Sequence, residues 1–203
     1  QNPAVGIQQF RELNQVENYL DEEQLQRLLT VLKKDKNRTV CGIVLFLLST
    51  GARLNEALQA RWSLIDVEHR VWRIPATNSK SGKVRAVPLN DAALEVLSKQ
   101  DTEDEFEHVF INRQTGLPYT TIQKVWERLR RKAGLEHVRI HDLRHSYASM
   151  LVNSGRSLYE VQQILGHSNP KVTQRYSHLS TATLQDAAGS AADRISEALK
   201  KAS

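Results

Sequence analysis

The chain has 203 residues, of which 40% are hydrophobic and 25% charged, the composition of an ordinary globular domain. Lys and Arg outnumber Asp and Glu by 28 to 23, which on its own is weak evidence for a polyanionic partner. The longest apolar run, residues 41–48, is too short to cross a bilayer, and Cys41 has no second cysteine with which to form an internal disulfide. The chain opens without a secretory signal, so we expect a cytoplasmic protein.

The first third of the sequence predicts three helices after a leading arm of residues 1–18. Acidic residues fill the first turn of residues 19–32, where leucines recur at helical spacing. Residues 38–50 include the apolar run, which indicates a buried helix, and Gly51 is expected to end it. A short helix is predicted over residues 53–60.

The pattern then changes to short segments rich in β-branched residues. These segments are residues 63–67, 71–77 and 84–89, and turn-forming stretches separate them. We expect a three-stranded antiparallel sheet, with Lys80 on the second of its two hairpins.

Helices return in the rest of the domain, which is expected to comprise residues 19–180. They are predicted over residues 91–99, 121–133, 141–155, 157–166 and 169–179. Together the elements predict a mainly α fold with a small three-stranded antiparallel sheet, an α+β class.

The last two helices begin with recognisable capping signals. Ser157 and Glu160 form a capping box, and Asn169 stands at the next N-cap with Pro170 at the first helical position. This start places Tyr176 about two turns into the final helix. A free phenol has a pKa of about 10, so a reacting tyrosine would need neighbours that stabilise its anion.

Basic residues are concentrated in the second half of the chain. Residues 124–132 carry five basic residues against one acidic residue, residues 139–175 also have a basic balance, and acidic residues gather at 101–108. A basic face set apart from an acidic loop suits binding to a phosphate backbone, although an ordinary solvated surface would have the same composition. The candidate DNA-binding residues are Lys83, Arg85, Lys124, Arg128, Arg131 and Arg139.

The segment HDLRH places His141 and Arg144 three residues apart, so both could face one target from a helix. His141 and His145 also have a spacing that could hold a metal ion. A zinc-protease helix would need Glu where Asp142 stands, and Arg144 between the ligands would oppose a divalent cation. We therefore expect no metal site here, and we expect His145 to be a half-buried packing residue.

Three other positions are candidates for chemistry. Arg53 follows the apolar helix, where its burial would be costly unless it met an anion. That anion could be Glu56 in a simple salt bridge, or it could be a bound ligand. Lys80 stands at a hairpin tip, where lysines are usually solvated, and His167 lies in a turn nine residues before Tyr176.

The combination of these residues favours one kind of chemistry. Two arginines, a lysine, two histidines and a tyrosine, without a metal-ligand cluster, suit phosphoryl transfer that needs no metal ion. The chain has no Walker A sequence and no carboxylate cluster of the two-metal type, so neither ATP or GTP hydrolysis nor two-metal nuclease chemistry is expected.

Four stretches resemble, in order and spacing, the motifs of the tyrosine recombinases, the phage integrase family. They are STGARLNEAL (49–58), NSKSGKVRAVPL (78–89), HDLRHSYASML (141–151) and LGHSNPKVTQRYSHL (165–179), within a resemblance that covers about residues 19–180. The resemblance implies the catalytic-domain fold of that family, double-stranded DNA as partner, a homo-tetramer on DNA and no cofactor. Members usually carry an N-terminal core-binding domain as well, so we expect this chain to be a fragment or a minimal form.

The resemblance also implies a role for each site residue. Tyr176 would attack a DNA phosphodiester in line and form a 3′-phosphotyrosyl link. The activating residues would be Arg53, Lys80, His141, Arg144 and His167, with Glu56 in the acidic accessory position. Forming phenolate at pH 7 costs about 4 kcal/mol, which nearby cations would reduce. Lys80 is the candidate general acid, His141 the base or proton shuttle, and His167 a donor to the phosphate.

Residues 181–203 are expected to form a C-terminal helical tail. Apolar side chains recur along it in a narrow stripe, at Leu184, Ala188, Ala191, Ile195 and Ala198. The tail could fold back on its own domain or fray, whereas the family resemblance implies docking on a neighbouring protomer.

A site-specific recombinase is the function that these patterns favour, and two alternatives stay open. A type IB topoisomerase uses similar chemistry and would relax plasmids without a specific site. A DNA-binding module without catalysis would need the basic face but not the six candidate catalytic residues together.

Overall fold

The computed structural model describes residues 18–78, 84–180, 185 and 189. Within these ranges the helices are α1 (Glu22–Lys34), α2 (Arg38–Thr50), α3 (Leu54–Leu58), α4 (Asp91–Ser98), α5 (Gln123–Lys132), α6 (Asp142–Asn153), α7 (Leu158–Leu165) and α8 (Pro170–Gln174). The strands are β1 (Ile65–Asp66), β2 (Val71–Ile74), β3 (Arg85–Pro88), β4 (Ile111–Asn112) and β5 (Leu117–Pro118). Short 3₁₀ turns are η1 (Trp62–Leu64), η2 (Ala76–Asn78) and η3 (Ser177–Ser180). The predicted fold class is confirmed.

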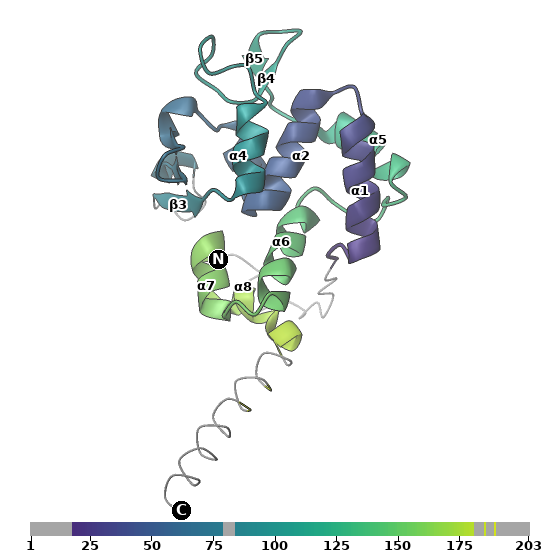
Figure 1. Cartoon of the computed structure of the whole chain (residues 1–203), viewed down its shortest axis with the longest axis vertical. Coiled ribbons are helices and arrows are strands. Elements are labelled where there is room, and N and C mark those ends of the chain that lie inside the picture. The colour runs from purple at the N-terminus through teal and green to yellow at the C-terminus, as the bar shows by residue number, and fades with distance from the viewer. Residues whose placement is uncertain (1–17, 79–83, 181–184, 186–188, 190–203) are drawn as a thin grey trace, which may run out of the picture.

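The apolar helix α2 lies at the centre of the fold (Figure 1). Nine of its 13 residues are buried, because α3, α4 and α6 all pack against it. The ring of Phe46 contacts Trp72 of β2 and Phe110, with ring centroids 5.2 and 5.6 Å away. The helix ends at Gly51, whose φ of 62° is the left-handed conformation that favours glycine. Both predicted ends of this helix are therefore confirmed.

The three predicted strands form one antiparallel sheet in the order β1–β2–β3. Trp72 pairs with Ile65 on one side and with Val87 on the other, and alternate side chains of β3 are buried. A second sheet, which pairs β4 with β5, has no counterpart among the predicted elements. Each of these strands has two residues, too few to show a period in the sequence.

Helix α6 belongs to two hydrophobic clusters. Leu143 in its first turn packs in the main core, whereas Ala148 and Val152 pack with Val161 and Leu165 of α7 in a smaller second cluster. In Figure 1, α7 and α8 lie below the sheet and the central helices, beside the lower half of α6. Helix α6 thus connects the core to the end of the domain that carries the predicted tyrosine.

A buried carboxylate joins three helices on the other side of the core. Asp35 accepts hydrogen bonds from Arg128 at 2.5 and 2.9 Å and from Lys132 at 3.2 Å, both on α5. It also accepts one from the backbone N–H of Asn37 at 3.0 Å, just before α2. The hydrogen bonds from Arg128 hold the pKa of Asp35 well below its usual range. One side chain at the end of α1 therefore fixes the positions of α2 and α5.

Asp35→Asn should lower the free energy of unfolding at pH 7 by about 2 kcal/mol, because an amide replaces a carboxylate that accepts charged hydrogen bonds. Folding lowers the pKa of this carboxyl from its ordinary value of 3.8. The stabilisation is therefore present above that pH and is lost as the pH falls further. Urea unfolding of both chains at pH 7 and pH 2 measures the difference, which should be smaller at pH 2.

The control for this prediction is Glu95→Gln, which removes an exposed ion pair with Lys99. It should change stability little at either pH. A loss in Asp35→Asn no larger than that of the control would contradict the role of Asp35.

Candidate active site

Four chain segments bring the predicted site residues together. Arg53 lies in the turn from α2 to α3, His141 and Arg144 at the start of α6, His167 in the turn from α7 to α8, and Tyr176 just after α8. Burial, followed by the charges of Arg144 and Arg53, lowers the pKa of His141 and of His167, and Tyr176 acts on the pKa of Arg144. Five of the six predicted catalytic residues therefore share one site.

Arg144 is the centre of this site. Only 3% of it is exposed, and its guanidinium donates to the carbonyl of Gly51 at 2.5 Å and to that of Leu165 at 2.6 Å. Burial, followed by the charges of Arg53 and Arg85, lowers the pKa of Arg144 to about 9. Both carbonyls are formally neutral, so an incoming anion would complement the arginine charge.

Glu56 is a buried carboxylate shared by two arginines. It accepts from Arg53 at 2.9 Å and from Arg85 at 2.6 Å, and its second oxygen also accepts from the backbone N–H of Arg53 at 2.8 Å. The salt bridge considered for Arg53 and Glu56 is therefore present. The side chain of Arg53 nevertheless keeps 27% of its surface exposed, so the salt bridge leaves it accessible to a ligand.

Arg85 does not have the position expected of a DNA-binding residue, and that prediction is wrong. Its side chain is 7% exposed, and besides Glu56 it donates to the carbonyls of Ile164 at 2.9 Å and Leu165 at 3.1 Å. Burial lowers its pKa. Arg85 occupies an inward position of β3, two residues before the buried Val87. The alternation of the strand was the sequence signal that could have placed it inside.

Two structural constraints explain why residue 166 is a glycine. It ends α7 with a φ of 66°, a conformation that L-residues rarely adopt. A Cβ at this position would lie 2.2 Å from Cδ of Arg85. The glycine of the LGH motif therefore lets α7 pack directly on the buried arginine.

His167 is oriented by the helix that follows it. Its Nδ1 lies 2.9 Å from the hydroxyl of Thr173 on α8, which leaves Nε2 as the nitrogen that could serve a ligand. Burial, followed by the charges of Arg144 and Arg53, lowers the pKa of His167 to about 3. The imidazole is therefore neutral at pH 7, and its Nε2–H would be a hydrogen-bond donor rather than a charge.

The sequence predicted that Tyr176 lies inside a helix, but the structure places it after the end of α8. Helix α8 ends at Gln174, and the N–H of Tyr176 bonds the carbonyl of Thr173 at 3.0 Å in a tighter turn. The ring is 2% exposed and packs in the second cluster with residues of α6 and α7. Its hydroxyl lies 2.5 Å from Nδ1 of His145. The capping prediction for Asn169 is confirmed, but the helix is shorter than expected.

His145 is half-buried, as predicted, but it also contacts the rings of two predicted site residues. Its ring lies edge-on to that of His141, with centroids 5.1 Å apart, and tilted to that of Tyr176 at 6.1 Å. The residues i and i+4 of a helix share a face, so His141 and His145 form a row beside the tyrosine. The sequence showed this spacing, but nothing in it paired His145 with Tyr176.

The other predicted DNA-binding residues have different environments. Lys124 and Arg131 are exposed on α5, whereas Arg128 is bound to Asp35 and Arg139 donates to the buried Asp142 at 2.8 Å. Lys80, Lys83 and the stripe of the predicted tail lie outside the described residues.

Two kinds of feature are absent from the described parts of the chain. No group of three or more His, Cys, Asp and Glu side chains there has the arrangement of a metal site. None of the helices there is long and apolar enough to span a membrane.

Comparison with known proteins gives consistent matches. A family model described as "Phage integrase family" matches residues 18–183. "Tyrosine recombinase XerC" of Actinobacillus pleuropneumoniae is 33% identical, over 88% of this chain and 60% of that protein. "Tyrosine recombinase XerA" of Saccharolobus solfataricus is 34% identical, over 79% of this chain and 52% of that protein. The chain thus spans about half to three-fifths of the length of these relatives.

Solved structures share the fold. The catalytic domain of bacteriophage HP1 integrase matches with a TM-score of 0.67 and 28% identity, over 84% of this chain and 93% of that one. The XerH site-specific recombinase bound to its palindromic difH substrate, in a post-cleavage complex, matches with a TM-score of 0.69 and 28% identity, over 86% and 53%.

Gly166→Ala should destabilise the protein by about 2 kcal/mol or more, because backbone strain adds to a clash with an arginine that three hydrogen bonds hold in place. Gly155→Ala is the matched control. It also sits at a positive φ, 81°, after a helix, but a Cβ there meets nothing within 4 Å. Its cost should be about 1 kcal/mol. Equal losses in urea unfolding would contradict the packing role of Gly166.

Proposed function

Because this chain belongs to the phage integrase family, we propose that it is a site-specific DNA recombinase that cuts and rejoins strands through a 3′-phosphotyrosyl intermediate. The observation that carries the proposal is the position of Tyr176 within electrostatic reach of the buried Arg144, in a site shared with Arg53 and His167. The similar XerH site-specific recombinase, solved with its difH substrate in a post-cleavage complex, supports DNA as the partner, and a DNA-acting enzyme would work in the cytoplasm. Residues 19–180 would be the catalytic domain.

The two arginines would bind the scissile phosphate. Arg144 has its charge buried against neutral carbonyls, and Arg53 is oriented by Glu56 while part of it stays exposed. An anion 4 Å from one such cation gains about 4 kcal/mol near a protein surface. The same arginine charges would also offset part of the free energy of about 4 kcal/mol needed to form phenolate at pH 7.

The chemical step would be an in-line displacement. The hydroxyl oxygen of Tyr176 forms a bond to phosphorus, and the bond from phosphorus to the 5′-oxygen breaks. His167 would donate to a nonbridging oxygen and stabilise the pentacoordinate state, and Lys80 would protonate the departing 5′-oxygen. His141 remains the candidate proton shuttle. The phosphotyrosine conserves the bond energy, so rejoining would need no nucleotide cofactor.

Contacts to the DNA backbone outside the site would come from exposed basic residues. Lys124 and Arg131 are exposed on α5, and Lys83 belongs to the same proposal. Arg128 and Arg139 keep 44% and 63% of their side chains exposed although each is paired with a buried carboxylate. They could therefore contact a phosphate with the remaining N–H groups.

Incubating the chain with a nicked suicide substrate should give a protein band covalently linked to DNA, and Tyr176→Phe should abolish it. The control is Tyr159→Phe, which alters a tyrosine that is 70% exposed on α7 and should leave the yield unchanged. The band should form equally after chelation of metal ions. Persistence of the adduct in Tyr176→Phe would exclude this tyrosine as nucleophile, and loss of the adduct on chelation would contradict a metal-free reaction.

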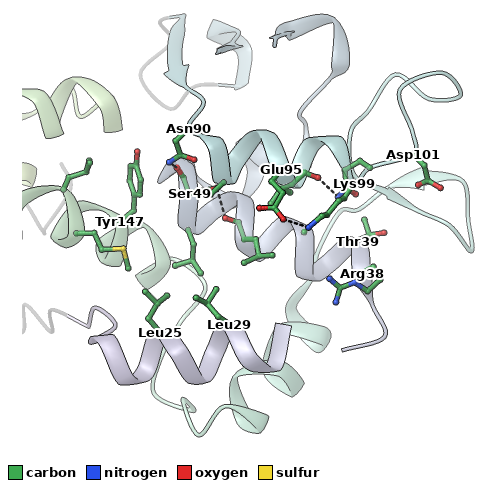
Figure 2. Close-up of a pocket in the computed structure, with 18 of the residues that line it drawn as sticks. Leu25, Leu29, Arg38, Thr39, Ser49, Asn90, Glu95, Lys99, Asp101 and Tyr147 are labelled. Carbon is green, nitrogen blue, oxygen red and sulfur yellow. Dashed lines mark hydrogen bonds and ion pairs between the residues drawn. The ribbon is translucent and has the colours of Figure 1, made fainter. Parts of the chain in front are cut away.

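We also propose that the tail, residues 181–203, docks on a neighbouring protomer in a tetramer on DNA. Its sequence carries an apolar stripe, and the domain has a pocket of about 780 Å³ between α1, α2, α4 and α6 that could receive one. Figure 2 shows Leu25 and Leu29 of α1 directed into this pocket. Leu29 is 40% exposed, so an apolar segment would remove it from water.

Leu29→Asp should reduce assembly of protomers on DNA by at least about 10-fold, because a charge in the pocket would oppose an apolar segment. Leu29 is exposed enough that the fold should tolerate the change. Val67→Asp is the control, since Val67 is 54% exposed and does not line the pocket. Sedimentation of protein on DNA measures assembly, and Ile195→Asp in the tail should match Leu29→Asp. Normal assembly of both variants would contradict the docking.

A further inference from the structure

The hydroxyl of Tyr176 is in contact with a side chain that the family motifs leave without a function. Nδ1 of His145 lies 2.5 Å from the tyrosine oxygen, a distance at the short end for such pairs. Only 2% of Tyr176 is exposed, so this contact is made away from bulk water. The ring of His145 is fixed by its position on α6 and by its edge contact with His141.

His145 is unprotonated on one ring nitrogen at pH 7, so that nitrogen can accept a proton. Burial, followed by the charges of His141, Arg175 and Arg144, lowers the pKa of His145 to about 4. The ring is therefore neutral at pH 7. In the tautomer that accepts from the phenol, Nδ1 carries the lone pair and Nε2 carries the hydrogen.

We propose that His145 is a further catalytic residue, the immediate proton acceptor for Tyr176 during strand cleavage. The inference rests on the proposed function of Tyr176 as nucleophile. As the tyrosine oxygen forms its bond to phosphorus, its O–H bond breaks and the proton passes to Nδ1, which gives an imidazolium. The bond from phosphorus to the 5′-oxygen breaks with its electron pair, and that oxygen takes a proton from the general acid.

Binding of the substrate favours this transfer. The groups that act on His145 are His141, Asp142 and Arg144 on α6 and Arg175 at the end of α8. It also lies within reach of Tyr176 and His167. A phosphodiester bound at Arg53 and Arg144 adds a negative charge that offsets these cations. The carboxylate of Asp142 already acts in the same direction and favours the imidazolium.

The test is His145→Asn, because an asparagine oxygen can accept the hydrogen bond near the position of Nδ1 but cannot take up the proton. Adduct formation on a nicked suicide substrate should fall about 100-fold at pH 7. The rate should then rise with pH more steeply than in the wild type, because hydroxide ionises the phenol directly. Gel shift and urea unfolding should show DNA binding and stability close to those of the wild type.

Two comparisons make the result specific. His69→Asn changes an exposed histidine of the β1–β2 turn and should cleave normally. A substrate with sulfur in place of the bridging 5′-oxygen has a leaving group that needs no proton. That substrate should restore cleavage to Lys80→Ala but not to His145→Asn, if Lys80 is the acid and His145 the base.

Cleavage by His145→Asn at or above the wild-type rate, or its recovery on the sulfur substrate, would overturn the assignment of His145. Neither outcome contradicts the role of Tyr176 as nucleophile, because both are measured on an adduct that forms only when Tyr176 is present. Absence of an adduct in the wild-type chain would instead overturn the proposed function, and the role of His145 with it.

Discussion

The site depends on a buried guanidinium held between two helix ends. Arg144 donates to Gly51 at the end of α2 and to Leu165 at the end of α7, where the carbonyls of each helix carry partial negative charge. Residues far apart in the sequence are thereby fixed around one cation. The carbonyl of Leu165 also accepts from Arg85, so the last turn of α7 is held from two directions. Apolar packing without these directional hydrogen bonds would fix the positions of α2 and α7 relative to α6 less closely.

The group formed by Arg53, Arg85, Arg144 and Glu56 carries a net positive charge. Among the described residues that contact one another here, Arg53 and Arg85 share the carboxylate of Glu56, and Arg144 is bound by carbonyls. Burial lowers the pKa of Arg85 and of Arg144, which means that both charges are held at a cost in solvation. Under the proposed function, a bound phosphodiester would supply the missing negative charge. Burial, followed by the charges of these cations, lowers the pKa of His141 and of His167, which favours the neutral imidazole.

Local sequence signals predicted the parts of the fold that local physics determines. Gly51 ended α2, and Ser157 with Glu160 capped α7, because caps depend on a few adjacent residues. The alternation of β3 could have placed Arg85 inside, but the partners of Arg85 and the position of Tyr176 were not predictable in the same way. Arg85 is buried because Glu56 and two carbonyls of α7 receive it, and Tyr176 leaves the helix to pack on α6 and α7. Both depend on contacts between segments distant in the sequence, and motif spacing alone does not contain them.

A glycine at the end of a helix can act as a hinge, and Gly166 precedes the segment that carries Tyr176. Its surroundings prevent that use. The carbonyl just before it is held by two arginines, and the space beside its Cα is filled by Arg85. Rotation at this glycine would break the hydrogen bonds that build the proposed phosphate site. Any reorientation of the tyrosine towards a substrate must therefore pivot further along the chain, beyond His167, so that the proposed nucleophile can turn while the arginines stay in place.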